Sequence, residues 1–187
     1  MSTEQTFGPA ITDPDPDVIA VLLGQHARVK DLFAQVDAAT GQAKQDLFDE
    51  LRLLLAAHET GEEVVLRPVS KKAAGEQVTE ARNAEEKEAN KVLTALEKLD
   101  VNGPEFAAEF AEFEKAVLAH AEREEREEFP AVRAQCTEQE LQQMGKRLLK
   151  AEKSAPTHPH VSAAGSPTAQ KVMGPFAAMV DKVRDAL

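Results

Sequence analysis

A short pattern of histidine and glutamate occurs twice in the chain. Both copies read H-x-x-x-E-E-x-x-x-[R/F]-P, and the second begins 62 residues after the first (from His58 to His120). In a helix, a His and a Glu four positions apart project from the same face, one turn apart. Two helices that present such pairs toward a common interior could hold metal ions between them.

Four stretches with helical apolar periodicity are available to position these side chains. They run over about 17–40, 42–66, 73–99 and 104–130, and the last two are separated by Asn102-Gly103-Pro104. Pro68 and Pro130 are expected to end the second and fourth helices, because proline lacks the N–H that a helix interior requires. Helices with short connections predict an all-α fold, an antiparallel up-down four-helix bundle with C-terminal peripheral helices.

The chain divides into three parts on this interpretation. Residues 1–16 form an extended leader, 17–130 form the bundle, and 131–187 form a C-terminal region. Within that region, Thr137 and Glu140 form a capping box that opens a short helix through Leu149. Residues 154–168 are a Pro/Ser/Ala-rich linker, and a terminal helix over about 169–187 follows.

The bundle also carries a fuller internal duplication. Gln25-His26 aligns with Glu85-Glu86 at an offset of 60 residues (from 26 to 86), so each half is a helical hairpin. Two hairpins packed with approximate two-fold symmetry bring equivalent polar residues to a shared midline. The candidate metal ligands at that midline are His26, His58, Glu62, Glu86, His120 and Glu124.

This ligand set indicates a hard to intermediate metal. Imidazole with carboxylate suits iron, manganese or zinc. Three carboxylates in one apolar interior would repel one another or stay unsatisfied without a cation. Two metal ions would supply the charge, with Glu62 and Glu124 placed to bridge them. Because six side chains are few for two metals, water, an oxo or hydroxo bridge, or open positions should complete the coordination.

On these residues, the region 17–130 resembles a hemerythrin-like (HHE cation-binding) domain of the actinobacterial type. The family's pattern is a lone His on the first helix, H-x-x-x-E on the second, a His on the third, and a second H-x-x-x-E. Here five of these positions match in order and spacing, and the E-E doublets and trailing prolines match as well. The resemblance implies a non-haem centre of two iron ions inside the bundle.

The third helix departs from the family pattern. The family's His falls on Glu86, with Glu85 as the alternative register, and Asn90 stands one turn on, where hemerythrins proper carry another His. A site richer in carboxylate favours the ferric state, which argues against reversible O2 carriage. Some actinobacterial hemerythrin-like proteins with such variation are linked to peroxide decomposition. The sequence therefore predicts a protein that reacts with small oxidants, above all a catalase-like decomposition of hydrogen peroxide.

Two other functions stay open. One is a non-catalytic sensor or store for O2, NO or iron, and the other is a metal-free bundle whose polar groups are structural. Individual residues carry their own alternatives. Glu63 and Glu125 are surface groups or lie behind the ligands, and the acidic run 122–128 is mostly a solvated face. His158 and His160 are exposed in the linker or close the site from outside, and Cys136 is a small apolar residue or a redox sensor.

Composition limits the remaining classes. The 187 residues carry a formal net charge of −11, so neither nucleic acid nor an anionic membrane is an expected partner. Cys136 is the only cysteine, which suits a reducing compartment. The polar, Pro/Asp-rich beginning is unlike a signal peptide, and no apolar run approaches a membrane span. We expect a cytoplasmic protein, a monomer or weak dimer, whose partner is a small-molecule oxidant (H2O2, O2 or NO).

Overall fold

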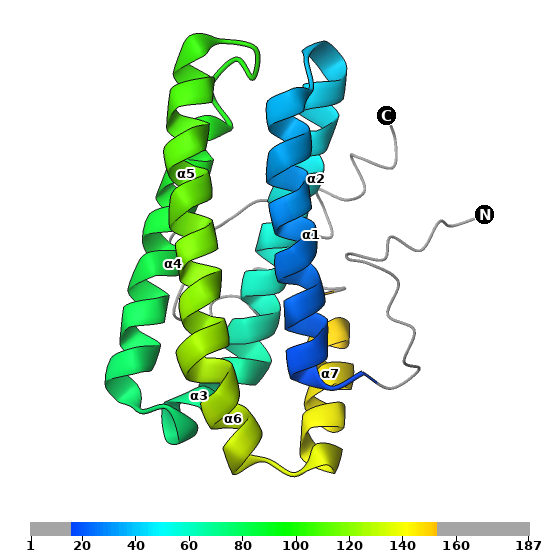
Figure 1. Cartoon of the computed structure of the whole chain (residues 1–187), viewed down its shortest axis with the longest axis vertical. Coiled ribbons are helices and arrows are strands. Elements are labelled where there is room, and N and C mark those ends of the chain that lie inside the picture. Colours follow the sequence, from blue (N-terminus) through cyan, green and yellow to red (C-terminus); the bar gives the residue numbers. More distant parts are fainter. Residues whose placement is uncertain (1–15, 153–187) are drawn as a thin grey trace, which may run out of the picture.

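The computed structural model describes residues 16–152, and within them the regular structure is entirely helical. Two helical hairpins lie side by side (Figure 1). The first pairs α1 (Val18–Ala38) with α2 (Gly41–Gly61), and the second pairs α4 (Glu76–Leu96) with α5 (Pro104–Arg123). The predicted antiparallel four-helix bundle is confirmed. The expectations for 1–15, the linker, the terminal helix, His158 and His160 lie outside the described residues.

Local signals explain where the helices begin and how the hairpins turn. The Asp17 side chain accepts a hydrogen bond from the backbone N–H of Ala20 at 2.8 Å and caps α1. Gly41 has a φ of +62° at the tight turn into α2, a conformation that glycine adopts without strain. Its N–H donates to Oδ1 of Asn102 at 2.7 Å, which ties the turn of the first hairpin to the turn of the second.

The expectation that Pro68 and Pro130 end their helices is wrong. After α2, a π-helical turn η1 (Glu62–Leu66) leads directly into α3 (Arg67–Ala73). After α5, a second π-helical turn η2 (Glu124–Glu128) leads into α6 (Phe129–Gln135). Both prolines lie in the first turn of the helix that follows. The α-helical hydrogen bond that each proline cannot make is avoided because the preceding turn is wider, with Arg67 N–H bonded to the Glu62 carbonyl and Phe129 N–H to the Glu124 carbonyl.

The capping box at Thr137 is confirmed. The Thr137 N–H and hydroxyl each donate to Oε2 of Glu140 at 2.8 Å, and α7 (Glu138–Glu152) follows. α7 lies outside the four-helix bundle, at the end where α3 and α6 are found, and packs on α1 and α2 (Figure 1). Gly145 makes this contact close, because a Cβ there would collide with the backbone carbonyl oxygen of Pro16.

Two apolar clusters fill the interior, and on α1 the buried residues Gln25 and His26 lie between them. One cluster is built around Phe33, Phe48 and Phe110, and the other joins the start of α1 to α3, α6 and α7 around Leu22 and Leu148. On α1, for example, the second cluster ends at Leu22 and the first begins at Val29. The histidines and glutamates of the repeat thus form a buried polar layer across the bundle. Among residues 16–152, no helix has the length and hydropathy that a membrane span needs.

Candidate metal centre

The six predicted site residues meet in the buried layer. Five are buried, and His120 is only slightly exposed. Their donor atoms form two overlapping groups, each with its atoms within 4.8 Å of one another. The first group consists of His26, His58, Glu62 and Glu124, and the second of Glu62, Glu86, His120 and Glu124. Glu62 and Glu124 belong to both groups, which is the arrangement expected of two bridging carboxylates.

The two shared carboxylates lie close to the three histidines. Oε1 of Glu62 lies 3.6 Å from Nε2 of His58, and Oε2 of Glu124 lies 3.5 Å from Nε2 of His26. The other oxygen of Glu124, Oε1, lies 3.2 Å from Nε2 of His120. Each histidine therefore presents Nε2 to the shared carboxylates.

The opposite nitrogen of each imidazole contacts an oxygen from elsewhere in the chain. Nδ1 of His58 lies 2.8 Å from the Gln25 side-chain oxygen, and Nδ1 of His120 lies 2.9 Å from a Glu85 oxygen. Nδ1 of His26 lies 2.8 Å from Oε1 of Glu125. Hydrogen bonds of this kind fix the ring orientation of metal-binding histidines and leave Nε2 free to bind the ion.

Several polar atoms in the cluster could bind a metal ion but make no hydrogen bond within the described part of the chain. Nε2 of His26, Oε1 of Glu62, Oε2 of Glu86 and Oε2 of Glu124 are buried and have no hydrogen-bond partner among the described residues. A buried polar atom without a partner costs folding free energy, roughly 1–3 kcal/mol and more when it is charged. All four are atoms that bind iron, manganese or zinc, so the residues present fit a divalent cation.

One cation of the chain already lies in this layer. Nη2 of Arg67 is 3.1 Å from Oε2 of Glu62 and 2.9 Å from Oε1 of Glu124, and it also contacts Oε1 of Glu86. Nη1 of Arg67 lies 2.6 Å from Oε1 of Glu128. One guanidinium therefore faces four carboxylates, and the cluster retains an excess of acidic groups that metal ions can offset.

The shared carboxylates differ in how readily they ionise. Burial raises the pKa of Glu62 well above its usual range, and the nearby Glu124 carboxylate raises it further. Burial also opposes the ionisation of Glu124, but the charge and hydrogen bonds of His120, with the His26 contact and Arg67, hold its pKa well below the usual range.

The two symmetry-related histidines also differ. Burial lowers the pKa of His58 to about 3, so this imidazole is neutral near pH 7 and able to bind a metal. Burial lowers the pKa of His120 as well, but Glu124 and Glu85 outweigh it and raise the pKa to about 9.

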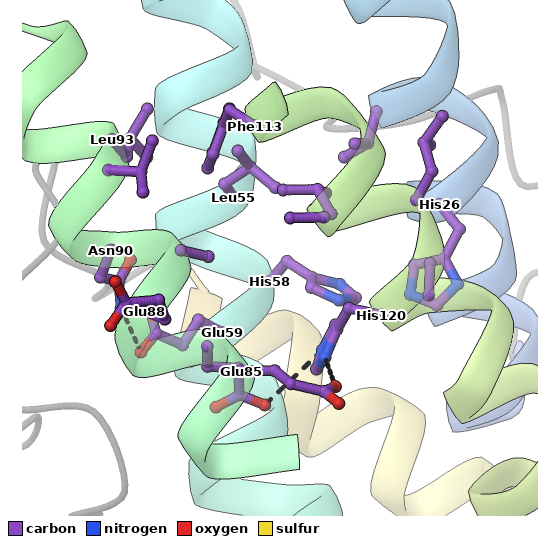
Figure 2. A pocket seen from close by; sticks show the side chains of 18 of the residues that line it. His26, Leu55, His58, Glu59, Glu85, Glu88, Asn90, Leu93, Phe113 and His120 are labelled. Carbon is purple, nitrogen blue, oxygen red and sulfur yellow. Dashed lines mark hydrogen bonds and ion pairs between the residues drawn. The ribbon is translucent and has the colours of Figure 1, made fainter. Parts of the chain in front are cut away.

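A cavity of about 340 Å³ leads to the histidines (Figure 2). Its walls are largely apolar and include Leu55, Leu93 and Phe113, whereas Glu88 and Glu112 on its lining are exposed. Figure 2 shows His26, His58 and His120 close together on one side of the cavity, with Glu85 bonded to His120 and Asn90 bonded to Glu59. Burial raises the pKa of Glu59 to about 7, although the Asn90 hydrogen bond lowers it.

The family model for the hemerythrin HHE cation-binding domain matches residues 17–132. The chain belongs to this family. The match spans all four long helices and both H-x-x-x-E repeats, so the resemblance predicted from the sequence is confirmed.

Relatives of the HHE domain are found in distant organisms. An uncharacterized hemerythrin-like protein of Schizosaccharomyces pombe is 30% identical over 136 residues, which cover 71% of this chain and 67% of that protein. A DNA nickase of Nostoc is 27% identical over 130 residues, covering 69% of this chain and 37% of the nickase. A crystal structure of a hemerythrin HHE domain-containing protein from Mycobacterium kansasii matches the fold with a TM-score of 0.66 at 24% identity, over 74% of this chain and 86% of that one.

The geometry of the HHE domain bears on the residues that the sequence left open. Glu86 lies among the candidate ligands, whereas Glu85 contacts the outer nitrogen of His120. Glu125 lies behind His26 rather than among the ligands. The acidic run 122–128 is largely exposed as predicted, with the exceptions of Glu124 and Glu128, which are fully buried.

Sequence reasoning missed several partners of the ligands. Arg67 was visible only as the variable position of the repeat, and Glu128 only as part of an acidic run. The sequence marks Gln25 only as the neighbour of His26, and it gives no sign of Glu152, whose Oε1 accepts a hydrogen bond from Gln25 at 2.7 Å. The equal spacing of Gln25 before His26 and Glu85 before Glu86 is the one pattern that could have identified the residues behind His58 and His120.

Proposed function

We propose that this HHE domain holds two iron ions between its four helices and uses them to decompose hydrogen peroxide. The proposed ligands are His26, His58, Glu62, Glu86, His120 and Glu124. The observation that carries the metal assignment is the orientation of the three imidazoles. Each is bonded through Nδ1 to a side-chain oxygen and turns Nε2 toward carboxylates with unpartnered buried oxygens.

The donor set supports oxidant chemistry over oxygen carriage. Three carboxylates and three imidazoles are a harder, more anionic set than a nitrogen-rich one, and they favour iron(III). In the proposed reaction one peroxide loses two electrons and two protons to become O2, and a second peroxide gains them to become two waters. Two bound iron ions would supply the change in oxidation state that this exchange requires.

The cavity supports a small neutral substrate. Its apolar walls admit molecules that need few hydrogen bonds, and exposed carboxylates of Glu88, Glu109 and Glu112 lie on its lining. Negative charge near an entrance lowers the local concentration of anions. Hydrogen peroxide, O2 and NO are uncharged and would enter more readily than azide or nitrite.

DNA cleavage, the activity that the Nostoc relative's name states for that protein, has no support in this chain. Its formal net charge is −11, whereas binding to a phosphate backbone is driven largely by Lys and Arg. The match also covers only 37% of the nickase. We therefore do not propose a nucleic-acid substrate.

The test combines iron counting with oxygen evolution. The full chain is loaded with iron, its metal content and optical spectrum are measured, and O2 released from added peroxide is followed with an electrode. We expect two irons per chain, an absorption band of a bridged diferric centre, and sustained O2 release. Glu62→Gln should lose iron and O2 release together, whereas Glu112→Gln, which changes an exposed carboxylate of the cavity lining, should keep both.

Three outcomes separate the alternatives. Two irons without O2 release would end the peroxide proposal and leave the metal centre. Reversible O2 binding by the reduced protein would instead favour a carrier or sensor. Absence of bound metal, with a melting temperature unchanged by chelators and by His58→Ala, would favour the metal-free bundle.

A further inference from the structure

We propose that the two halves of the metal centre are unequal: the first ion binds on the His26–His58 side, and the second must displace Arg67. This inference rests on the proposed metal centre. The ions then bind in a fixed order, and Arg67 is an internal competitor for the second ion.

The unpartnered oxygens of the bridging carboxylates face one side of the cluster. Oε1 of Glu62 and Oε2 of Glu124, which point to His58 and His26, have no hydrogen-bond partner among the described residues, and neither has Nε2 of His26. An ion on this side would gain two imidazoles and two carboxylate oxygens without displacing a lysine or arginine side chain.

The other side is already paired with a cation. Oε2 of Glu62, Oε1 of Glu124 and Oε1 of Glu86 all contact the same atom, Nη2 of Arg67. Arg67 is 4% exposed, so these pairs lie in a poorly screened environment. If Glu62 and Glu124 bridge the two ions, a metal ion that binds beside His120 needs Oε2 of Glu62 and Oε1 of Glu124, and it must replace the guanidinium to obtain them.

The π-helical turn brings Arg67 to this position. In an α-helix, residues five apart point in directions about 140° apart, so Arg67 would face away from Glu62. In η1, the Arg67 N–H bonds to the Glu62 carbonyl, and the wider turn stacks the two residues on one face. The guanidinium is held from behind by Glu128, which is fully buried and bonds to Nη1.

The internal duplication shows that this arrangement belongs to one half only. Arg67 is equivalent to Phe129 at the same offset of 62 residues (from 67 to 129), and Glu86 is equivalent to His26. Phe129 stacks on His26 with ring centroids 5.6 Å apart and planes 17° apart, whereas Arg67 pairs with Glu86. The carboxylate at the third-helix position is thus matched by a cation, and the imidazole at the first-helix position by an aromatic ring.

When the second ion displaces Arg67, the guanidinium can remain paired with Glu128. Its Nη1 stays within reach of Glu128 when Nη2 leaves the ligand carboxylates, so the charge remains paired in the fully loaded protein. The form with one ion is therefore a stable intermediate, with Arg67 serving as the second cation of the site.

The test is a titration of the metal-free full chain with Co2+, followed by calorimetry and by the cobalt absorption bands. Wild type should bind one ion tightly and a second more weakly. In Arg67→Gln the competitor is gone. The dissociation constant of the second ion should fall about tenfold or more from its wild-type value, while that of the first ion changes little. Arg52→Gln is the matched control, because it removes an arginine paired with Asp49 and Glu97 away from the site.

Glu128→Gln provides a test in the opposite direction. Without the Glu128 charge, Arg67 loses its second anchor and should hold the ligand carboxylates more firmly, so the second ion should bind more weakly. If this effect acts through Arg67, it should vanish in the Arg67→Gln background, as a double-mutant cycle measures. Should Arg67→Gln fail to fold without metal, Glu128→Gln alone still decides the direction.

The outcomes distinguish this inference from the function on which it rests. Two equal dissociation constants in wild type, or a second constant unchanged by both variants, would overturn the role of Arg67 while keeping the metal centre. No Co2+ binding by any form would overturn the metal centre itself.

Discussion

At the residue scale, the outer nitrogens of the imidazoles matter as much as the atoms that face the carboxylates. Spacing along the sequence predicts His58 with Glu62 and His120 with Glu124, because a four-residue interval in a helix fixes their common face. The oxygen behind His58 comes from Gln25, 33 residues away, and that oxygen's position depends on how two helices pack. Such contacts are set by packing, so the sequence could predict the ligand candidates but not their supports.

Gln25→Leu tests the support of His58. We expect this variant to bind the first metal ion about 10–100-fold more weakly, because the ring loses the hydrogen bond that fixes its orientation. The measurement is Co2+ titration of the metal-free protein. Gln35→Leu is a suitable control, since Gln35 lies on the same helix and its side chain donates to Asp31 at the exposed surface. Equal affinities for the two variants would count against the support role of Gln25.

At the element scale, the two π-helical turns explain why the helix ends were predicted incorrectly. Each proline is expected to stop its helix. Instead, the backbone hydrogen bond just before each proline reaches back five residues rather than four, and the chain continues as a helix. Sequence periodicity does not distinguish a helix that stops from one that contains such a turn. The same limit hid Arg67, whose place in the site depends on the π-helical turn and would be wrong for an uninterrupted α-helix.

α7 makes the stability of the protein depend on pH through Glu152. Burial raises the pKa of this carboxyl from 4.5 to about 7, although a hydrogen bond from Gln25 lowers it. Because the folded pKa is raised, the protonated form contributes stability that is fully present below pH 4.5 and is lost as pH rises through 7. The full effect corresponds to about 3 kcal/mol.

Glu152→Gln should remove this dependence. Relative to wild type, the variant should gain free energy of unfolding as pH rises from 4.5 to 8, because glutamine keeps an oxygen for Gln25 and carries no charge. Urea unfolding at several pH values measures the difference, and other titrating groups cancel between the two proteins. A difference that is constant with pH would contradict the assignment.

The contact between α7 and the start of α1 depends on a residue without a side chain. Gly145→Ala should lower the free energy of unfolding by about 2 kcal/mol, because its Cβ would force the Pro16 backbone away from α7. Thermal unfolding measures the loss. Gly41→Ala is an instructive comparison, since nothing lies within 4 Å of a Cβ there and any loss would come from the positive φ alone. An unchanged melting temperature for Gly145→Ala would mean that α7 does not pack closely on α1.

At the scale of the whole molecule, the bundle is a duplicated hairpin whose ligand set loses its symmetry where Glu86, paired with Arg67, stands in place of a second His26. The duplication, the bundle and the polar midline could all be predicted from the sequence, because they depend on periodicity and spacing. The sequence shows that Glu86 stands where the family has a His, but it does not show that Glu86 pairs with Arg67. Its partner is recognised once the π-helical turn places the guanidinium on that carboxylate.

The double substitution Glu86→His and Arg67→Phe would restore the symmetry. It gives the second half the same imidazole and aromatic ring that His26 and Phe129 give the first. We expect the two metal ions to bind with similar affinities, the second about tenfold or more tightly than in wild type. The reduction potential should also rise, because imidazole in place of a carboxylate favours iron(II). A lower potential, or a second ion bound as weakly as in wild type, would contradict this account.

The central claim, that the four helices bind two metal ions between the repeats, is tested most directly by anomalous diffraction at the iron edge from crystals of the iron-loaded full chain. We expect two peaks inside the bundle, one beside His26 and His58 and the other beside His120 and Glu86, with Glu62 and Glu124 between them. A peak outside this layer, or none within it, would contradict the claim.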